Sequence, residues 1–249
     1  MITASELEKV LFEIAPPELA EEWDNVGIMV DSCKASDKIL FALDCTEEVI
    51  GEAKDRGCGI VVTHHPFIFH PLKRIDGRMA VYSAIRSDVS VLSVHTNYDA
   101  ANNGVNDVLS SAIRLTDVET AGMGRTGYLD GGPVSLKSFC HMLKEELNAV
   151  TLEAADAGIP VHKVMVVGGS GGDFLSLAKE NGCDTLLTGE AAHHEGIEAH
   201  VLGVNLVVAG HFRTENPSIP NLCRLVQEKI GNKAECFISV RNTDPFQQI

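Results

Sequence analysis

A pattern that is repeated at constant spacing in the two halves of the chain constrains the fold most strongly. Three short matches recur 125 positions later (Thr63 to Thr188, for example): Ala53-Lys54, Gly57-Cys58 and Thr63 return as Ala178-Lys179, Gly182-Cys183 and Thr188. Both halves also contain a histidine four positions before an acid, as His95 with Asp99 and His211 with Glu215. A chance match among common residues is the alternative explanation. The fixed register favours two similar lobes that arose by duplication.

Apolar runs of strand length alternate with segments of helical periodicity along the whole chain. Strands are predicted over residues 38–43, 60–62, 89–94, 163–167, 185–188, 205–209 and 235–240, and helices over 5–14, 47–56, 79–87, 104–113, 136–147, 174–180 and 219–230. This alternation predicts an α/β fold with mixed sheets. The glycine-rich residues 122–133 are the predicted boundary between a first lobe, residues 1–124, and a second lobe, residues 125–249.

Composition excludes several classes of protein. The 249 residues carry a formal net charge of −15, which argues against binding to the phosphate backbone of a nucleic acid. Seven cysteines without any Cys-x-x-Cys pair suggest neither a disulfide framework nor a thiolate zinc site. The start of the chain lacks the features of a signal peptide, and no apolar run has the length of a membrane span, so a cytoplasmic protein without membrane contact is expected.

Two adjacent histidines follow the predicted strand at residues 60–62, in the stretch Gly-Ile-Val-Val-Thr-His-His-Pro at residues 59–66. Pro66 holds the backbone of His65 extended. Because successive side chains of extended backbone point in opposite directions, His64 and His65 are expected to diverge and to bind two neighbouring metal ions more readily than one. A pair of surface histidines is the alternative.

Other polar residues also come directly after predicted strands. Ligands of open α/β sheets gather outside the carboxyl ends of the strands, and two pseudo-symmetric lobes would bring these ends together in a cleft. Five side chains are expected to converge there: His64, His65, Asp99, His211 and Glu215. Three imidazoles and two carboxylates suit two divalent transition-metal ions such as zinc, iron, manganese, cobalt or nickel.

A series of short motifs in a fixed order resembles one known family. The motifs are Trp23-Asp24-Asn25-Val26-Gly27, Thr63-His64-His65-Pro66, His95-Thr96-Asn97-Tyr98-Asp99-Ala100-Ala101, Gly104-Val105-Asn106-Asp107, Thr188-Gly189-Glu190, Gly210-His211-Phe212-Arg213-Thr214-Glu215 and Asp244-Pro245-Phe246. Together they are similar to the Nif-three-like family, whose members are often labelled GTP cyclohydrolase I type 2 homologues. Residues 122–133 leave no room for the domain that longer members insert, so the chain resembles the short form.

The resemblance implies a two-lobed protein with a dinuclear metal site, often assembled as a hexameric ring. It places the metal ligands on the same five residues. His95 and Glu190 belong to the motifs and are expected around the ligands or in the substrate pocket, as catalytic residues. Proton transfer or phosphate contact is the expected role of His95, and a neutral structural histidine is the alternative. A metal-dependent hydrolase acting on a small phosphorylated or nucleotide-like substrate is then expected. The alternative is a non-catalytic ring protein that binds or handles metal or recruits partners.

Two further features have simpler explanations. The glycines at residues 168–172 resemble a phosphate-binding loop but match no nucleotide-binding motif, so a tight turn from strand to helix is favoured. Trp23 is expected to be a packing anchor at a junction between lobes or subunits.

Overall fold

The computed structural model describes residues 1–246, and within them the chain folds into two compact units. The first unit contains residues Met1–Gly104 and Ile219–Thr243. The second contains Val105–Ser218 and the described residues from Asp244 onward. Each unit has its own mixed sheet with helices on both faces, which confirms the predicted α/β class.

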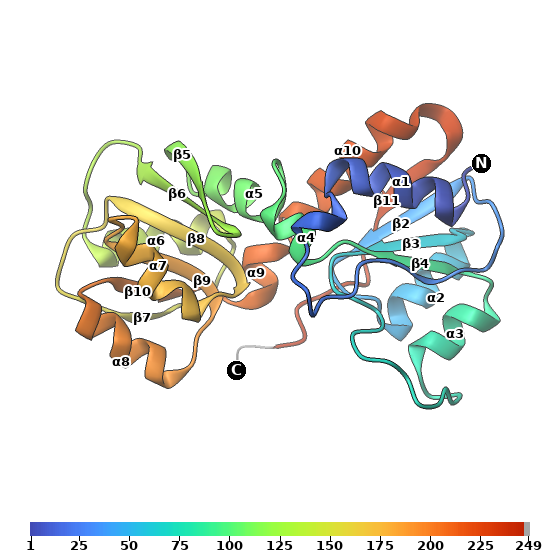
Figure 1. The fold of residues 1–249 in the computed structure, drawn as a ribbon, viewed down its shortest axis with the longest axis horizontal. Coiled ribbons are helices and arrows are strands. Elements are labelled where there is room, and N and C mark those ends of the chain that lie inside the picture. Colours follow the sequence, from blue (N-terminus) through green and yellow to red (C-terminus); the bar gives the residue numbers. More distant parts are fainter. Residues whose placement is uncertain (247–249) are drawn as a thin grey trace. The chain divides into compact units, whose positions relative to one another are not determined.

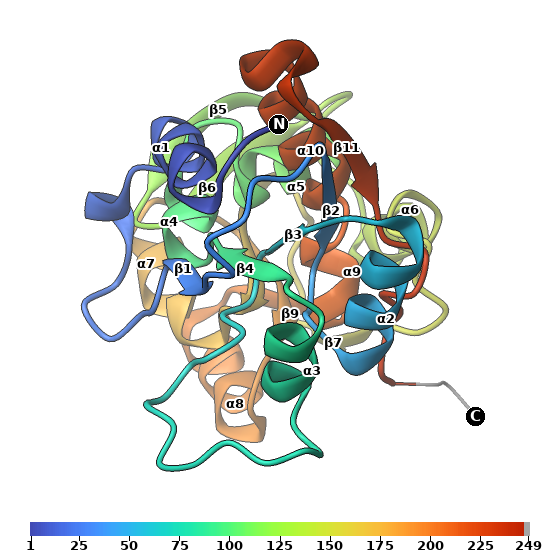
Figure 2. The same ribbon diagram turned by 90° about the vertical axis from the view of Figure 1, so that its right-hand side faces the viewer.

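The sheet of the first unit has the strand order β1-β4-β3-β2-β11 (Figures 1 and 2). Its strands are β1 (Gly27–Val30), β2 (Lys38–Ala42), β3 (Ile60–Thr63), β4 (Ser90–Ser93) and β11 (Glu235–Ile238). Strands β11, β2, β3 and β4 are parallel, and β1 is antiparallel to β4 at the edge. The parallel strands are apolar and buried, as expected for a sheet that helices cover on both sides.

Helices α2 (Glu47–Arg56) and α3 (Ala80–Arg86) cover one face of this sheet, and α1 (Ala4–Ile14) and α10 (Ser218–Ile230) cover the other (Figure 1). Alternate strand residues supply the two faces. Leu40, Val61 and Val91 pack in one cluster with α2 and α3. Their neighbours Phe41, Val62 and Leu92 are also fully buried and point to the opposite face.

Local signals in the sequence set the ends of these helices. Thr3 precedes α1 and forms a capping box with Glu6, and Thr46 accepts a hydrogen bond from the backbone of Val49 at the start of α2. Gly57 ends α2 with a left-handed backbone, φ 70°. The predicted helix over residues 47–56 therefore matches α2 at both ends.

The sheet of the second unit has the strand order β5-β6-β8-β9-β10-β7. Its strands are β5 (Leu115–Ala121), β6 (Gly124–Leu129), β7 (Glu153–Ala155), β8 (Lys163–Ser170), β9 (Thr185–Glu190) and β10 (Asn205–Val208). Strands β8, β9 and β10 are parallel, whereas β5, β6 and β7 run antiparallel to their neighbours.

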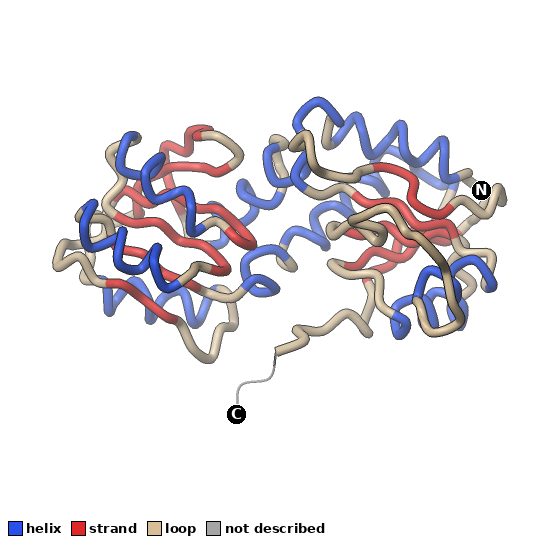
Figure 3. The backbone as a smooth tube through the Cα atoms, turned by 60° about the horizontal axis from the view of Figure 1, so that its bottom comes forward, coloured by secondary structure: helices blue, strands red, loops and turns tan. Residues whose placement is uncertain are grey.

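The same alternation distributes the core of the second unit between two helical layers (Figures 1 and 3). Val164, Val166 and Leu187 pack in a cluster with α5 (Val105–Ala112) and α6 (Leu136–Glu146). Residues one position along the strands, such as Met165 and Leu186, pack with α7 (Leu175–Glu180) and α8 (His193–Leu202).

The two units share one arrangement of elements. Each contains three parallel strands that follow one another along the chain, with an antiparallel strand paired to the third of them: β2, β3, β4 and β1 in the first unit, β8, β9, β10 and β7 in the second. A short helix follows the third parallel strand in both, α4 (Thr96–Ala100) after β4 and α9 (His211–Glu215) after β10. The sequence repeat thus corresponds to a repeat in topology.

The division of the chain differs from the boundary placed at residues 124 and 125. Residues 122–133 contain strand β6, which pairs with β5 and β8 inside the second sheet. Helix α10 and strand β11 return to the first unit, because β11 pairs in parallel with β2. None of the helices over residues 1–246 is long and apolar enough to cross a bilayer.

Candidate metal centre

His64 lies at the end of β3 with its ring fully buried. Its Nδ1 lies 2.9 Å from the backbone carbonyl oxygen of Val94. A carbonyl oxygen only accepts hydrogen bonds, so Nδ1 carries the hydrogen and Nε2 is the nitrogen with a lone pair. That Nε2 lies 3.5 Å from Oδ1 of Asp99.

Two further histidines of the first unit, His65 and His95, are held by carboxylates. His65 Nδ1 donates to Asp44 Oδ1 at 2.7 Å, and His95 Nδ1 donates to Asp24 Oδ1 at 2.8 Å. A carboxylate that accepts from one imidazole nitrogen fixes the ring orientation and leaves Nε2 to bind a metal, as in many metal sites.

These three histidines form a cluster. One ring nitrogen from each of His64, His65 and His95 lies within 4.8 Å of the other two. The expectation that His64 and His65 diverge is wrong, because their ring centroids are only 5.1 Å apart. Strand β3 ends at Thr63, and both histidines lie on the bend after it, where the alternation of a strand no longer applies.

Asp99 is placed by the short helix α4 directly after β4. The helix begins after His95, and the buried side chain of Asn97 anchors it by accepting from the His95 backbone and donating to the carbonyl of Ala15. Asp99 is 7% exposed. A largely buried carboxylate beside an imidazole nitrogen is a donor pair that suits a divalent cation.

Asp24 is a carboxylate that accepts several hydrogen bonds. It accepts hydrogen bonds from His95, from the Thr96 backbone at 3.0 Å and from the Thr96 hydroxyl at 2.5 Å. Burial raises the pKa of Asp24, but these hydrogen bonds outweigh burial and lower it to about 2. Asp24 is therefore ionised near neutral pH, and it holds His95 in one orientation.

The second unit contains a histidine–carboxylate group. His211 is the first residue of α9, and its Nε2 lies 3.0 Å from Oε2 of the buried Glu215 at the other end of the helix. Its Nδ1 lies 3.3 Å from Oε1 of Glu190, the last residue of β9. Glu190 is therefore positioned to orient His211, in the same way that Asp44 orients His65.

The glycine-rich residues 168–172 make room for this group. A Cβ atom on Gly169 would lie 2.1 Å from Glu215 Oε1 and 3.1 Å from His211 Nε2. Backbone N–H groups of Gly168, Gly169 and Gly171 donate to side chains of Asn106, Thr214 and Thr188. Because these N–H groups already have acceptors within the protein, the segment acts as a tight turn, as favoured from the sequence.

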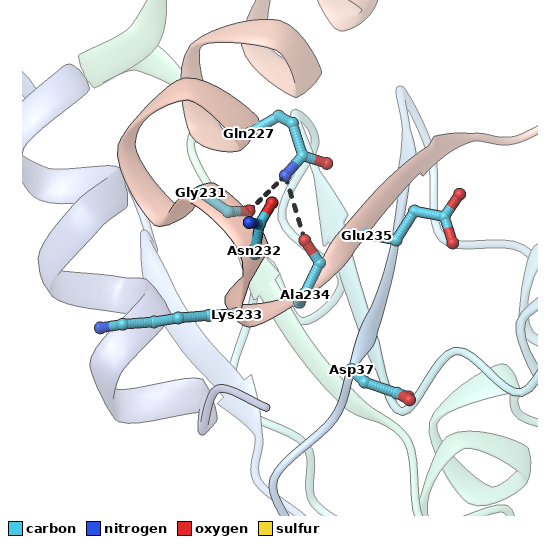
Figure 4. A pocket seen from close by; sticks show the side chains of 7 residues that line it. All are labelled: Asp37, Gln227, Gly231, Asn232, Lys233, Ala234 and Glu235. Carbon is cyan, nitrogen blue, oxygen red and sulfur yellow. Dashed lines mark hydrogen bonds between the residues drawn. The ribbon is translucent and has the colours of Figure 1, made fainter.

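Two other features contain none of the predicted ligands. His193 and His194 are exposed at the start of α8. A pocket at the end of α10 is lined by Asp37, Gln227, Gly231, Asn232, Lys233, Ala234 and Glu235 (Figure 4). There Gln227 donates to the carbonyls of Gly231 and Ala234 at 2.8 and 3.1 Å, and the Lys233 side chain points away from those of Asp37 and Glu235. Its charged groups do not converge, unlike those of a typical ligand site.

The carboxylates Asp24 and Asp44 were not predicted as site residues. Asp44 follows a predicted strand and Asp24 lies in the first family motif, so the position of each in the sequence could have indicated a site residue. Their roles depend on which imidazole each one faces, and that pairing joins residues 21 and 71 positions apart.

Comparison with known proteins identifies the family. The family model described as Duf34/NIF3 (NGG1p interacting factor 3) matches residues 2–245.

The chain belongs to the Duf34/NIF3 family.

Relatives of similar length support this assignment. A Clostridium perfringens protein named GTP cyclohydrolase 1 type 2 homolog is 34% identical, over 98% of this chain and 99% of that protein. A Clostridium acetobutylicum protein of the same name is 32% identical over 99% and 98%. The structure of a Bacillus cereus protein related to NIF3 shares the fold, with a TM-score of 0.92 at 22% identity over 99% of both chains.

Proposed function

We propose that this Duf34/NIF3 protein holds two divalent transition-metal ions with His64, His65, Asp99, His211 and Glu215, and that it hydrolyses a small phosphorylated or nucleotide-like substrate. One observation carries the proposal. His64 and His65 each offer a ring nitrogen within 4.8 Å of the other, and the Nδ1 of each is hydrogen-bonded, to a carbonyl in His64 and to a carboxylate in His65. Histidines that only fill space need no such common orientation, whereas metal ligands do.

The chemistry of the donors fits the ions expected. Imidazole nitrogen and carboxylate oxygen suit zinc, iron, manganese, cobalt and nickel, and five donors exceed what one tetrahedral ion with an open position requires. When bound, such ions supply a Lewis acid and an activated water.

The residues around the donors have separate tasks. His95 is held by the ionised Asp24 and transfers a proton or contacts a substrate phosphate through its other nitrogen. Glu190 is half exposed and keeps the His211 ring in place. The names of the clostridial relatives, GTP cyclohydrolase 1 type 2 homolog, are the support for a nucleotide-like substrate.

The first experiment measures metal content by elemental analysis after reconstitution with each of the five metals. We expect two ions per chain in the wild-type protein. His64→Ala, in the first unit, and Glu215→Ala, in the second, should each lower the stoichiometry, as should Asp99→Asn. His141→Ala, which removes an exposed histidine of α6, is the matched control and should keep both ions.

The second experiment measures turnover of phosphate esters and nucleotides by the metal-loaded protein. The His64→Ala, Glu215→Ala double variant should lose the activity, and His95→Gln should lower the rate more than the metal content. Equal rates for the wild-type protein and the double variant would remove the hydrolase proposal.

The alternative is a non-catalytic metal-binding or partner-recruiting protein. The family description, NGG1p interacting factor 3, favours it, because that description refers to an interaction rather than to a reaction. Two tightly bound ions without turnover across the whole substrate panel would support this alternative.

A further inference from the structure

Two aromatic side chains lie exposed beside the histidine cluster of the first unit. Trp23 is 58% exposed and Phe69 is 42% exposed. Their ring centroids are 5.7 Å apart, with 45° between the planes. The centroid of His95 lies 6.1 Å from that of Trp23 and 6.4 Å from that of Phe69. We call Trp23 and Phe69 the aromatic pair.

The backbone on both sides of the aromatic pair is held in place. Phe69 lies in the long segment between β3 and α3 (Figure 2), and Asn25 Nδ2 donates to the carbonyl of Ile68 in that segment at 2.5 Å. Next to Trp23, Asp24 is fixed by its hydrogen bonds from His95 and Thr96. The residues adjacent to both rings are therefore anchored, which lowers the entropy cost of binding a ligand there.

Exposure of two neighbouring aromatic rings indicates a binding surface. Exposed aromatic groups next to polar ligand-binding residues are typical of sites that bind ring systems, because a flat ring face stacks on another ring. Trp23 was expected to be a packing anchor at a junction between lobes or subunits, and in the described chain more than half of it is accessible.

The residues around the pair favour a neutral ring over a cation. The neighbouring carboxylate Asp24 has a fully buried side chain and is occupied by His95 and Thr96. The imidazole of His95 borders the pair instead, nearly perpendicular to both rings at 73° and 77°. The hydrogen bond from Nδ1 to Asp24 fixes the orientation of this imidazole beside the pair.

We propose that Trp23 and Phe69 bind the planar heteroaromatic ring of a small-molecule ligand, a nucleobase or a pterin, beside His95. This inference rests on the proposed function, because it names the part of the substrate that lies outside the metal site. Nucleobases and pterins share a flat ring with polar edges, and the experiment distinguishes between them.

Fluorescence gives a direct measurement, because Trp23 is the only tryptophan of the chain. The metal-free protein is titrated in chelator with guanosine monophosphate, adenosine monophosphate, neopterin and ribose 5-phosphate. We expect saturable quenching by the nucleotides or by neopterin and none by ribose 5-phosphate, which has no ring system to stack. The class that binds more tightly, nucleotides or neopterin, identifies the bound ring as a nucleobase or a pterin.

Variants test whether the aromatic pair is responsible. Phe69→Leu keeps an apolar side chain but removes the ring, and it should weaken ring binding by about tenfold, the effect of one stacking contact. Trp23→Leu should weaken binding similarly in calorimetry. Tyr82→Ala removes another exposed aromatic residue of the same unit, on α3, and should leave the affinity unchanged.

Several outcomes would overturn the proposal. The first three are absence of quenching, equal quenching by ribose 5-phosphate, and an equal loss of ligand affinity in Tyr82→Ala. The fourth is a Trp23 fluorescence signal that depends on protein concentration alone, which would assign the pair to an interface between copies of the chain. Ring binding in chelator is independent of metal content. Loss of ring binding with two ions retained contradicts only this inference, and ring binding without any metal affinity contradicts only the proposed function.

Discussion

At Gly169, adding a single Cβ atom would interfere with the side chains of Glu215 and His211. Its missing side chain lets the turn after β8 approach Glu215 and His211. Near the end of strand β8, Gly169 has a positive φ of +65°. A glycine is required here for two reasons, the backbone conformation and the close approach.

We predict that Gly169→Ala lowers metal affinity by at least about tenfold, because Cβ displaces Glu215 or the turn. The matched control is Gly182→Ala, which has a similar φ of +70° and no heavy atom within 4 Å of the new Cβ. Both variants should lose about 1–2 kcal/mol of unfolding free energy from backbone strain. Only Gly169→Ala should lose metal in a chelator competition. Equal metal affinities would show that the turn adapts.

The carboxylate of Asp44 orients the imidazole of His65 by accepting a hydrogen bond from its Nδ1. Replacement by asparagine keeps the shape but weakens the hydrogen bond to Nδ1 and removes the charge that fixes the imidazole tautomer. We predict a loss of about 10–100-fold in metal affinity for Asp44→Asn, measured by competition with a chromogenic chelator. Asp37→Asn, an exposed carboxylate of the same unit, should have wild-type affinity.

At the scale of elements, Glu52 joins helix α2 to the segment after β11. Its buried carboxylate accepts from the Ser239 hydroxyl at 2.6 Å, from the backbone N–H groups of Val240 and Arg241, and from Arg56 at 2.9 Å. Burial raises the pKa of Glu52, but these hydrogen bonds outweigh burial and hold it below its ordinary value. These hydrogen bonds attach the C-terminal segment to the first unit. Strand β11, which precedes this segment, is the edge strand of the sheet of that unit.

We predict that Glu52→Gln lowers the unfolding free energy at pH 7 by about 1–3 kcal/mol, as for hydrogen bonds to a charged group. A carboxyl with a lowered folded pKa stabilises the fold above its unfolded pKa, and this contribution is lost as pH falls through the folded pKa. The difference between wild type and variant should therefore shrink below about pH 4.5. Urea unfolding at several pH values measures it, with the exposed Asp55→Asn on the same helix as control.

A difference that stays constant down to pH 3 would contradict the role given to the charge of Glu52. It would mean that the side chain contributes through packing alone.

At the scale of the whole molecule, the family resemblance predicts a hexameric ring. We expect native mass spectrometry and light scattering to give a species with six times the chain mass of 26.8 kDa. The acidic composition, with a pI near 5.0, gives like-charged copies that repel one another at neutral pH. Assembly should therefore be favoured by moderate salt rather than disrupted by it. A monomer at micromolar concentration in 150 mM salt would refute this prediction.

Much of the fold follows from local sequence. The strand at residues 60–62 and the helix at residues 47–56 are recognised by apolar periodicity and caps, because those signals lie within the segment itself. Among the elements that were not predicted are strands β5 and β6 and helix α8. Strand β5 is largely exposed, β6 contains two glycines, and α8 buries only Ala199 fully, so none of them has the hydrophobic pattern that sequence analysis detects.

The sequence alone determined the donor residues proposed for the metal site, the repeated halves and the α/β class, since these depend on residue type, spacing and position after a strand. Tertiary structure decided which acceptor faces each imidazole: Val94 for His64, Asp44 for His65 and Asp24 for His95. It also decided that His64 and His65 lie close together and that β11 joins the first sheet. The physical reason is that these contacts join residues distant in sequence or depend on where a strand bends, and neither is encoded in a local pattern.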